Sequence, residues 1–170
     1  MRINEILLEG PQVKYPITPA IQQQAKESGM GFVYWGQSVT PAEASQCFTM
    51  INKSIEAMLK PENCKFNLQN MRPNGNTLAI VPNDDNFPIL ECDYDTAIAA
   101  DGKVYHTIGI DAGYAQKTSK GFVTSLIAQL YKAMEFLHGP GQRTMAINDD
   151  KGAGVWQAIM SKLGAVDEPF

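Results

Sequence analysis

The chain has 170 residues, of which 44% are hydrophobic and 19% charged, and its formal net charge is −4. This length and apolar content suffice for one globular domain with a core of its own. The acidic balance and the scattered Lys and Arg argue against nucleic-acid binding, which requires a basic surface to neutralise phosphates. No apolar run approaches the roughly 20 residues that a membrane helix requires.

The cysteines and histidines give no sign of a disulfide framework or a metal site. The three cysteines, Cys47, Cys64 and Cys92, are an odd number without metal-ligand spacing, which favours a reducing compartment. Only two histidines occur, and no ligands cluster around either. The N-terminus lacks the long apolar centre of a signal peptide. We therefore expect no metal and a cytoplasmic location, or packaging within a particle.

The first 30 residues are expected to form a short helix and an arm, and residues 31–170 the folded domain. The segment MRINEILLE places its apolar residues on one side of a helix, which the following Gly-Pro pair ends. Residues 12–31 contain two prolines and a Gln-rich patch. This composition indicates an arm more than a part of the core.

Two helices are predicted from their N-terminal caps. Thr18 and the proline after it can open a helix that continues through Lys26, because Thr caps well and Pro suits the first helical position. Thr40 and Glu43 form a capping box around Pro41. The apolar residues that follow, from position 44 to 59, recur at helical spacing.

The remaining elements alternate between strands and helices. Aromatic and β-branched residues predict strands at 31–36, 77–81, 88–94, 103–110 and 143–147. Helical spacing predicts helices at 121–138 and 155–163. The segment 67–76 is polar and turn-rich, and Asp101-Gly102 is a strong hairpin signal. This order favours a single α/β domain: one central mixed sheet with helices on both faces.

Several side chains are candidates for chemistry. Asp93 and Asp95 alternate on a predicted strand, so both can face one side and hold an amine; solvated surface is the alternative. Cys47, His106 and Asp111 supply the residue types of a cysteine hydrolase. Cys47, however, lies on the apolar face of its helix and far from the cap, which favours a buried core cysteine.

Two tryptophans allow two interpretations as well. Trp35 and Trp156 can line a pocket, although core packing is the commoner position for tryptophan. The run Asn148-Asp149-Asp150 is most simply a turn before the last helix, because its oxygen ligands are not spaced as in a calcium loop.

Residues 106–130, HTIGIDAGYAQKTSKGFVTSLIAQL, resemble the strand–loop–helix of the GNAT superfamily of N-acyltransferases. In that family a strand ending in a V-D-P-x-Y phrase leads into a glycine-rich pyrophosphate loop. The segment from Ile110 to Tyr114 is similar to the phrase, and Lys120-Gly121 is similar to the Lys-Gly of the loop. Backbone N–H groups at a helix N-terminus suit a pyrophosphate, and glycine permits its close approach.

The resemblance implies that acetyl-CoA is the cofactor. The strand end pairs with the pantetheine chain in this family, and the loop with the phosphates. The cofactor-binding residues implied are Ile108, Gly109, Ile110, Lys117, Lys120, Gly121, Phe122 and Val123.

A second segment, residues 144–165, is similar to the family's strand followed by a helix that ends in K-L-G. This chain also departs from the family pattern. About three extra residues follow Tyr114, Val123 stands in place of a loop glycine, and Met160 stands where a tyrosine often protonates the departing thiolate.

The resemblance implies an N-acyltransferase that transfers an acetyl group from acetyl-CoA to an amine of a small molecule or peptide. Asp93 and His106 are the candidates for the catalytic base. The alternative is a catalytically inactive GNAT-like protein of a phage, internal to the particle or interacting with the host, and Val123 and Met160 favour it.

The N-terminal nonapeptide carries a further resemblance. Tailed phages direct internal proteins into the prohead with a short N-terminal helix, which a protease removes after a Leu/Ile-x-Glu phrase. Leu7-Leu8-Glu9 precedes Gly10 in this way, which implies a phage protein within the capsid interior. The alternative is an ordinary N-terminal helix that packs on the domain. The oligomeric state is left open by the sequence.

Overall fold

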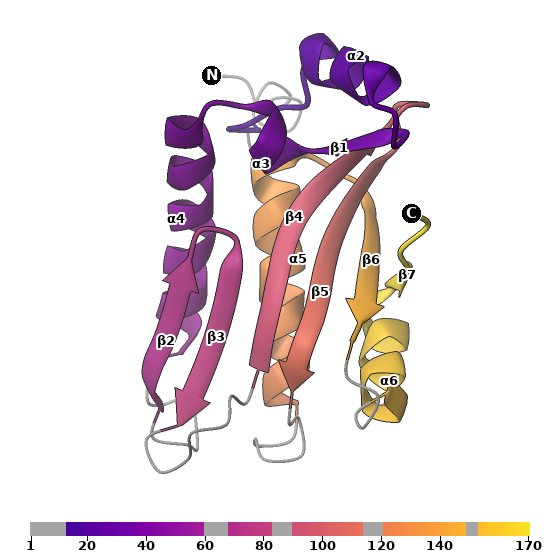
Figure 1. The fold of residues 1–170 in the computed structure, drawn as a ribbon. Helices are drawn as coiled ribbons and strands as arrows, with labels where there is room; N and C mark the ends of the chain where they lie inside the picture. Colours follow the sequence, from indigo (N-terminus) through magenta and orange to yellow (C-terminus); the bar gives the residue numbers. More distant parts are fainter. Residues whose placement is uncertain (1–12, 60–67, 83–89, 114–120, 149–152) are drawn as a thin grey trace, which may run out of the picture.

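The computed structural model describes residues 13–59, 68–82, 90–113, 121–148 and 153–170. Its elements form a mixed α/β arrangement, as the sequence predicts (Figure 1). The helices are α2 (Pro19–Glu27), α3 (Trp35–Ser38), α4 (Pro41–Met58), α5 (Phe122–His138) and α6 (Ala153–Leu163). The strands are β1 (Phe32–Tyr34), β2 (Leu68–Asn74), β3 (Thr77–Pro82), β4 (Leu90–Ala99), β5 (Val104–Gly113), β6 (Gln142–Ile147) and β7 (Val166–Asp167).

The strands form one sheet in the order β2-β3-β4-β5-β6-β7. Neighbours from β2 to β5 are antiparallel, whereas β5, β6 and β7 run parallel through crossovers that contain α5 and α6. The edge of β4 that faces away from β5 has two successive partners. β3 pairs with the first residues of β4, and β1 pairs antiparallel with its last residues, from Ala97 to Ala99. The middle of that edge, near Asp95, therefore faces α3.

The two long helices α4 and α5 lie on the same face of the sheet (Figure 1), and Gln129 of α5 donates a hydrogen bond to Ser54 of α4 (2.7 Å). The sequence predicted helices on both faces, whereas these two long helices share one face. The reason is the alternation along β4, where Leu90, Cys92 and other even positions are buried and Asp93 is exposed. Only one face of the central strands offers apolar surface to a helix.

Both tryptophans belong to the core, with exposed fractions of 2% for Trp35 and 0% for Trp156. The same core includes Ile21 and Ala25 of α2, so this part of the expected arm packs onto the domain. Thr18 accepts a hydrogen bond from the Ile21 N–H, as a cap should. The processed segment that the sequence suggests, residues 1–9, lies outside the described residues.

Strand β2 was not predicted. Its residues fall in the segment that we interpreted as turn-rich, and they pair with β3 around a tight turn at Gly75, which has a φ of 61°. An edge strand needs no apolar face to be hydrogen-bonded, so polar residues and Pro73 are compatible with it. Strand β7, which was not predicted either, pairs with β6 in parallel.

Among the described residues, none of the helices combines the length and the apolar character needed to cross a bilayer.

The capping box of α4 provides a test of the fold. Thr40 accepts from the Glu43 N–H, and the Glu43 carboxylate accepts from the Thr40 N–H. Thr40→Ala is expected to lower the free energy of unfolding by about 1 kcal/mol, measured by urea denaturation. The matched control is Thr49→Ala on the exposed face of the same helix, which removes no cap. Equal stabilities of the two variants would contradict the capping role.

Candidate functional site

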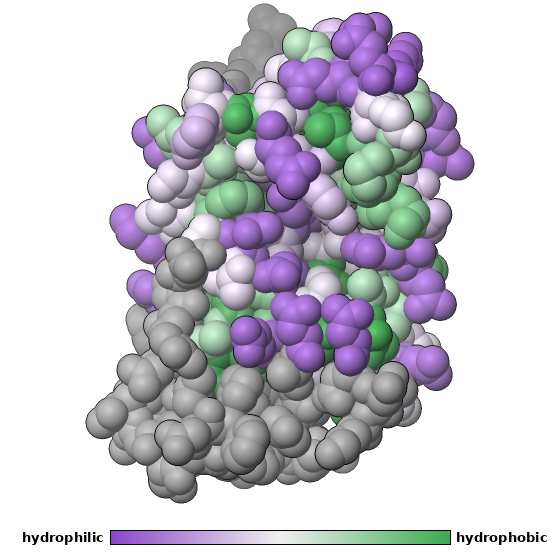
Figure 2. Space-filling view, in the orientation of Figure 1, coloured by the Kyte–Doolittle hydropathy of each residue, from purple (hydrophilic) through white to green (hydrophobic). Residues whose placement is uncertain are grey.

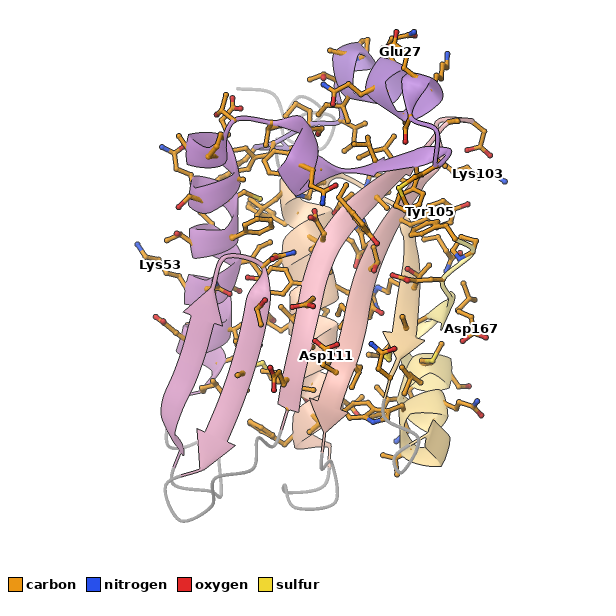
Figure 3. All side chains as sticks on the ribbon, in the orientation of Figure 1. Glu27, Lys53, Lys103, Tyr105, Asp111 and Asp167 are labelled. Carbon is orange, nitrogen blue, oxygen red and sulfur yellow. The ribbon has the colours of Figure 1, made fainter. Side chains whose placement is uncertain are left out.

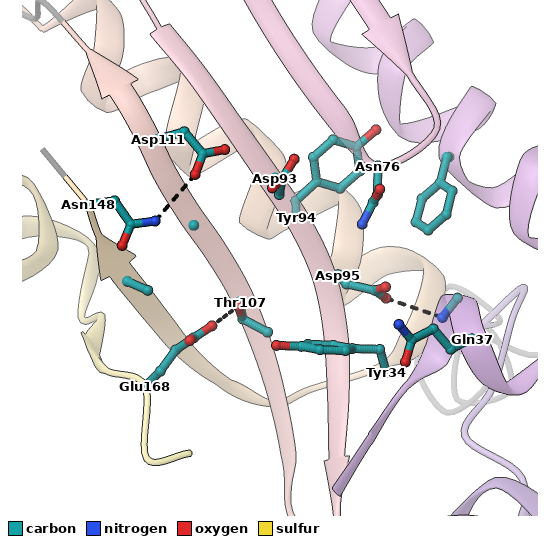
Figure 4. Close-up of a pocket in the computed structure, with 14 residues that line it drawn as sticks. Tyr34, Gln37, Asn76, Asp93, Tyr94, Asp95, Thr107, Asp111, Asn148 and Glu168 are labelled. Atoms are coloured by element: carbon teal, nitrogen blue, oxygen red, sulfur yellow. Dashed lines mark hydrogen bonds between the residues drawn. The ribbon is translucent and has the colours of Figure 1, made fainter.

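A cleft of about 470 Å³ opens on the face of the sheet that carries Asp93, Asp95 and Thr107, and Phe48 of α4 also lines it. Hydrophilic residues gather around the middle of this face (Figure 2). The close-up in Figure 4 shows the lining side chains, which come from α3, α4, the central strands and the C-terminal segment. The lining residues are Tyr34, Gly36, Gln37, Phe48, Asn76, Asp93, Tyr94, Asp95, Thr107, Gly109, Asp111, Ala146, Asn148 and Glu168.

Strand periodicity explains why polar residues gather here. Successive side chains of a strand point to opposite faces, so Asp93 and Asp95 of β4 share the open face with Thr107 and Gly109 of β5. The pairing of β4 with β5 shifts by one residue at Asp111, which forms a β-bulge. A bulge re-aims the side chain that it carries, and the Asp111 carboxylate lies beside the cleft (Figure 3).

Asp93 and Asp111 form a pair of neighbouring carboxylates. Thr77 donates its hydroxyl to Asp93 Oδ1 (2.7 Å), and Asn148 donates its side-chain amide to Asp111 Oδ1 (3.3 Å). Partial burial and the adjacent Asp93 charge raise the pKa of Asp111, against the opposing effect of the Asn148 hydrogen bond. Two neighbouring negative charges favour the uptake of a proton or of a cation.

Asp95 lies deeper in the cleft, near Tyr34. Burial raises the pKa of its carboxyl from 3.8 to about 7, although the N–H groups of Thr96 (2.7 Å) and Gly36 (3.3 Å) donate to Oδ1 and favour the ionised form. Burial raises the pKa of Tyr34 as well, and the charges of Glu168 and Asp95 add to that shift. Glu168 accepts a hydrogen bond from the Thr107 hydroxyl.

The negative charge of the cleft is not balanced by the described residues. Its four carboxylates come from Asp93, Asp95, Asp111 and Glu168, and neither Lys nor Arg lines it. The described ion pairs join other residues, Lys103 with Asp101 and Arg143 with Glu135. Lys53 and Lys103 extend from the margins of the molecule (Figure 3). Such a cleft favours a positively charged ligand.

Across the part of the chain that the structure describes, His, Cys, Asp and Glu nowhere form a group of three or more that could hold a metal ion. The carboxylates are instead spread along the cleft.

The two predicted candidates for the base are not brought together. Asp93 lies in the cleft, whereas His106 is buried on the helix-covered face of β5. Its two ring nitrogens contact Thr96 Oγ1 (2.9 Å) and the Gly139 carbonyl (2.8 Å). Burial lowers the pKa of His106, so the neutral ring donates from Nε2 and accepts at Nδ1. His106 therefore has a structural position, because strand alternation directs it away from Asp93.

The cysteine hydrolase arrangement is not formed either. Cys47 is fully buried and its sulfur contacts Nε2 of His138 (3.6 Å), not His106. His138 Nδ1 lies 2.7 Å from the Tyr15 carbonyl. Burial raises the pKa of the Cys47 thiol to about 12 and lowers the pKa of His138 to about 4. The pair is a neutral thiol and a neutral imidazole, which is the expected core cysteine and not a nucleophile.

The predicted cofactor strand is paired along both edges. Ile108, Gly109 and Ile110 pair with β4 on one side and with β6 on the other, and the Asn148 N–H donates to the Ile110 carbonyl (2.9 Å). The backbone edge that pantetheine would need is thus occupied at these three residues. Of the three, Gly109 lines the cleft.

The predicted phosphate-binding residues lie partly outside the described residues, since Lys117 and Lys120 are not described. Gly121 has a φ of 83° and caps α5 without a side-chain hydrogen bond. Phe122 and Val123 are buried in the core, so the valine that stands in place of a loop glycine packs inward. Met160 is buried too.

Most of the cleft was not identified from the sequence. Gly109 was predicted, but as a cofactor-binding residue; alternation could also have found Thr107, because Thr107, Gly109 and Asp111 follow one another at a spacing of two on one predicted strand. Nothing in the sequence indicated Tyr34 or Glu168, since their elements reach the cleft only through tertiary packing.

Comparisons of this chain with protein-family models, with curated proteins and with solved structures found no match. The geometry of the cleft and the resemblance of residues 106–130 and 144–165 to GNAT enzymes are therefore the grounds for a functional proposal.

The pKa of Asp95 predicts a pH dependence of stability. Between 3.8 and about 7 the folded protein holds the Asp95 proton more tightly than the unfolded chain, so this group stabilises at low pH and the effect is lost as pH rises through 7. Asp95→Asn cannot ionise. As the pH rises from about 4 to 7, we expect the free energy of unfolding of this variant to fall less steeply than that of the unmodified protein. The two slopes should differ by up to about 1.4 kcal/mol per pH unit.

The measurement is urea denaturation between pH 4.5 and 8. Asp167→Asn, at an exposed position outside the cleft, serves as the control and should follow the unmodified protein. Parallel pH profiles for Asp95→Asn and the control would contradict the raised pKa.

Proposed function

We propose that this protein binds an organic amine in the acidic cleft and acylates it, as an N-acyltransferase. The observation that carries the amine is the cleft itself, a cavity whose described lining residues include four carboxylates and no cationic side chain. A protonated amine would neutralise Asp93 and Asp111 and would gain charge-assisted hydrogen bonds. The acyl transfer rests on the resemblance of residues 106–130 and 144–165 to GNAT enzymes.

Asp95 is the side chain best suited to accept a proton from the amine. A general base works best when its pKa lies near the working pH, and burial raises the pKa of Asp95 to about 7. Tyr34, beside it, can donate a hydrogen bond to the substrate or to a water. Asp95 thus takes the role that the sequence suggested for Asp93 or His106, and Asp93 becomes a residue that binds the charged amine.

The fit of acetyl-CoA to these residues is uneven. The N-cap of α5 is Gly121, which has no side chain to bond the N–H groups of the first turn, and such N–H groups suit a pyrophosphate. In contrast, the β6 side of β5 is paired up to Ile110, and among the described residues a pantetheine could pair with that edge only from Asp111 onward. When bound, acetyl-CoA would supply the acetyl group as a thioester; the chain's own part is to bind, orient and deprotonate the amine.

The second candidate function is amine binding without acyl transfer, in a non-enzymatic interaction protein. The pairing of β5 with β6 from Tyr105 to Ile110 favours it, as does the buried Met160 in place of a tyrosine. A phage origin and packaging within the particle belong to this proposal and depend on the N-terminal nonapeptide.

Calorimetric titration with acetyl-CoA and with free CoA separates the two functions. The acyltransferase predicts micromolar binding, about −8 kcal/mol, and acetylation of an amine in a mixed panel, detected by mass spectrometry. Asp95→Asn should then reduce the transfer rate by about a hundredfold while leaving the Kd for acetyl-CoA unchanged. Asp167→Asn is the matched control. The absence of binding at millimolar acetyl-CoA would eliminate the enzyme and favour the interaction protein.

A further inference from the structure

The carboxylates of the cleft fall into two groups along the strands. Asp93 and Asp111 lie at one end, where the Asp93 charge acts on Asp111. Asp95 and Glu168 lie at the other: Asp95 pairs in register with Thr107, whose hydroxyl donates to Glu168. Figure 4 shows this division. Asp93 and Asp95 are two residues apart on one strand, which is about 7 Å.

The floor of the cleft beside Asp93, between Asp111 and Thr107 on β5, carries almost no side chain. Gly109 pairs in register with Asp93 on one side and with Ala146 on the other, and all three line the cleft. A Cβ built on Gly109 would meet no atom within 4 Å, so the space above the backbone is open. The rings of Phe48 and Tyr94, with centroids 5.8 Å apart, supply apolar surface to the same cavity. The cleft therefore offers negative charge at two levels of the strands and an open, uncharged floor at Gly109 and Ala146.

We infer that the amine is a linear diamine or polyamine, with two ammonium groups separated by about four methylene groups. The inference rests on the proposed function, because it specifies the amine of that site. Two strand residues contain six backbone bonds, and five bonds join the nitrogens of a four-carbon diamine, so the two lengths agree. One nitrogen is anchored by Asp93 and Asp111, and the other lies beside Asp95.

Other cations use the cleft less completely. A monoamine or a lysine side chain has one ammonium group, so one of the two sets of carboxylates is left without a cation. A divalent metal ion would require ligands that converge on one point, and the described residues provide no such group. The separation of the charges thus selects the ligand more than their sum does.

Calorimetry with 1,4-diaminobutane and with butylamine, on the full chain and without acetyl-CoA, tests this inference. The two ligands have the same carbon chain and differ in one nitrogen. We expect the diamine to bind at least about tenfold more tightly, and Asp93→Asn to abolish this preference. Asp167→Asn should retain the preference.

The outcomes separate this inference from the proposed function. Equal affinity for the two ligands would overturn the diamine and keep amine binding. Absence of binding by either ligand would overturn both. A preference for the diamine in a protein that never acetylates it would support the diamine and remove only the acyl transfer.

Gly109→Leu supplies a steric test of the open floor at Gly109. The new side chain enters open space at a residue without a positive φ, so it should lower diamine affinity at least about tenfold with little change in the melting temperature. Gly154→Leu, at an exposed position of α6 that is equally open, is the control and should bind normally. Unchanged affinity in a folded Gly109→Leu protein would place the ligand elsewhere and overturn the inference.

Discussion

The register of β4 is the constraint on which both the core and the cleft depend. β4 is paired with β5 along one edge and with β3 and β1 on the other, and its side chains alternate strictly from Leu90 to Asp95. A slip by one residue would move the buried set to the open face and would bury Asp93 and Asp95 against α4 and α5. Burying an unpaired carboxylate costs several kcal/mol. The acidic cleft and the hydrophobic core are therefore two results of one alternation.

Asp95 shows how the same strand makes a carboxyl with an unusual affinity for protons. β3 and β1 leave the middle of the β4 edge to α3, and a Cβ on Gly36 would lie 2.8 Å from Phe48 Cζ and 3.0 Å from Asp95 Oδ2. Only glycine permits this close approach, which excludes water from the carboxyl. The two N–H donors stabilise the anion, yet the pKa still rises to about 7, so desolvation is the larger effect. Asp93, at the mouth of the cleft, is exposed.

Local signals in the sequence predicted local structure well. The capping box at Thr40 and the turn at Asp101-Gly102, where Gly102 has a φ of 87°, depend on residues close together in the chain and are confirmed. Asp93 was assigned to the site by its alternation with Asp95. The same parity, applied to β5, separates His106 from Asp111, and it was the available reason to doubt His106 as a base.

What could not be predicted depends on contacts between distant segments. Strand β2 is defined by its pairing with β3 and not by apolar residues of its own. Glu168 reaches the cleft because β7 adds to β6 and directs the C-terminal residues across β5, where Phe170 stacks on Phe32 with ring centroids 4.3 Å apart. Neither arrangement leaves a periodic pattern in the sequence, so no reading of composition or spacing could supply it.

The point at which β5 loses its neighbour β6 matters more for the proposed chemistry than the resemblance of the β5 residues to a known family. A strand–loop–helix and a strand–helix follow in the expected order, but whether a pantetheine can pair with β5 depends on β6, which occupies that edge through Ile110. The bulge at Asp111 interrupts the ladder with β4 at the same place. At Asp111, beside the carboxylate pair of the cleft, β5 has therefore lost β6 and its pairing with β4 is irregular. In the proposed function, a cofactor that used the β5 backbone would meet the amine there, so the position of this bulge would determine whether binding can lead to transfer.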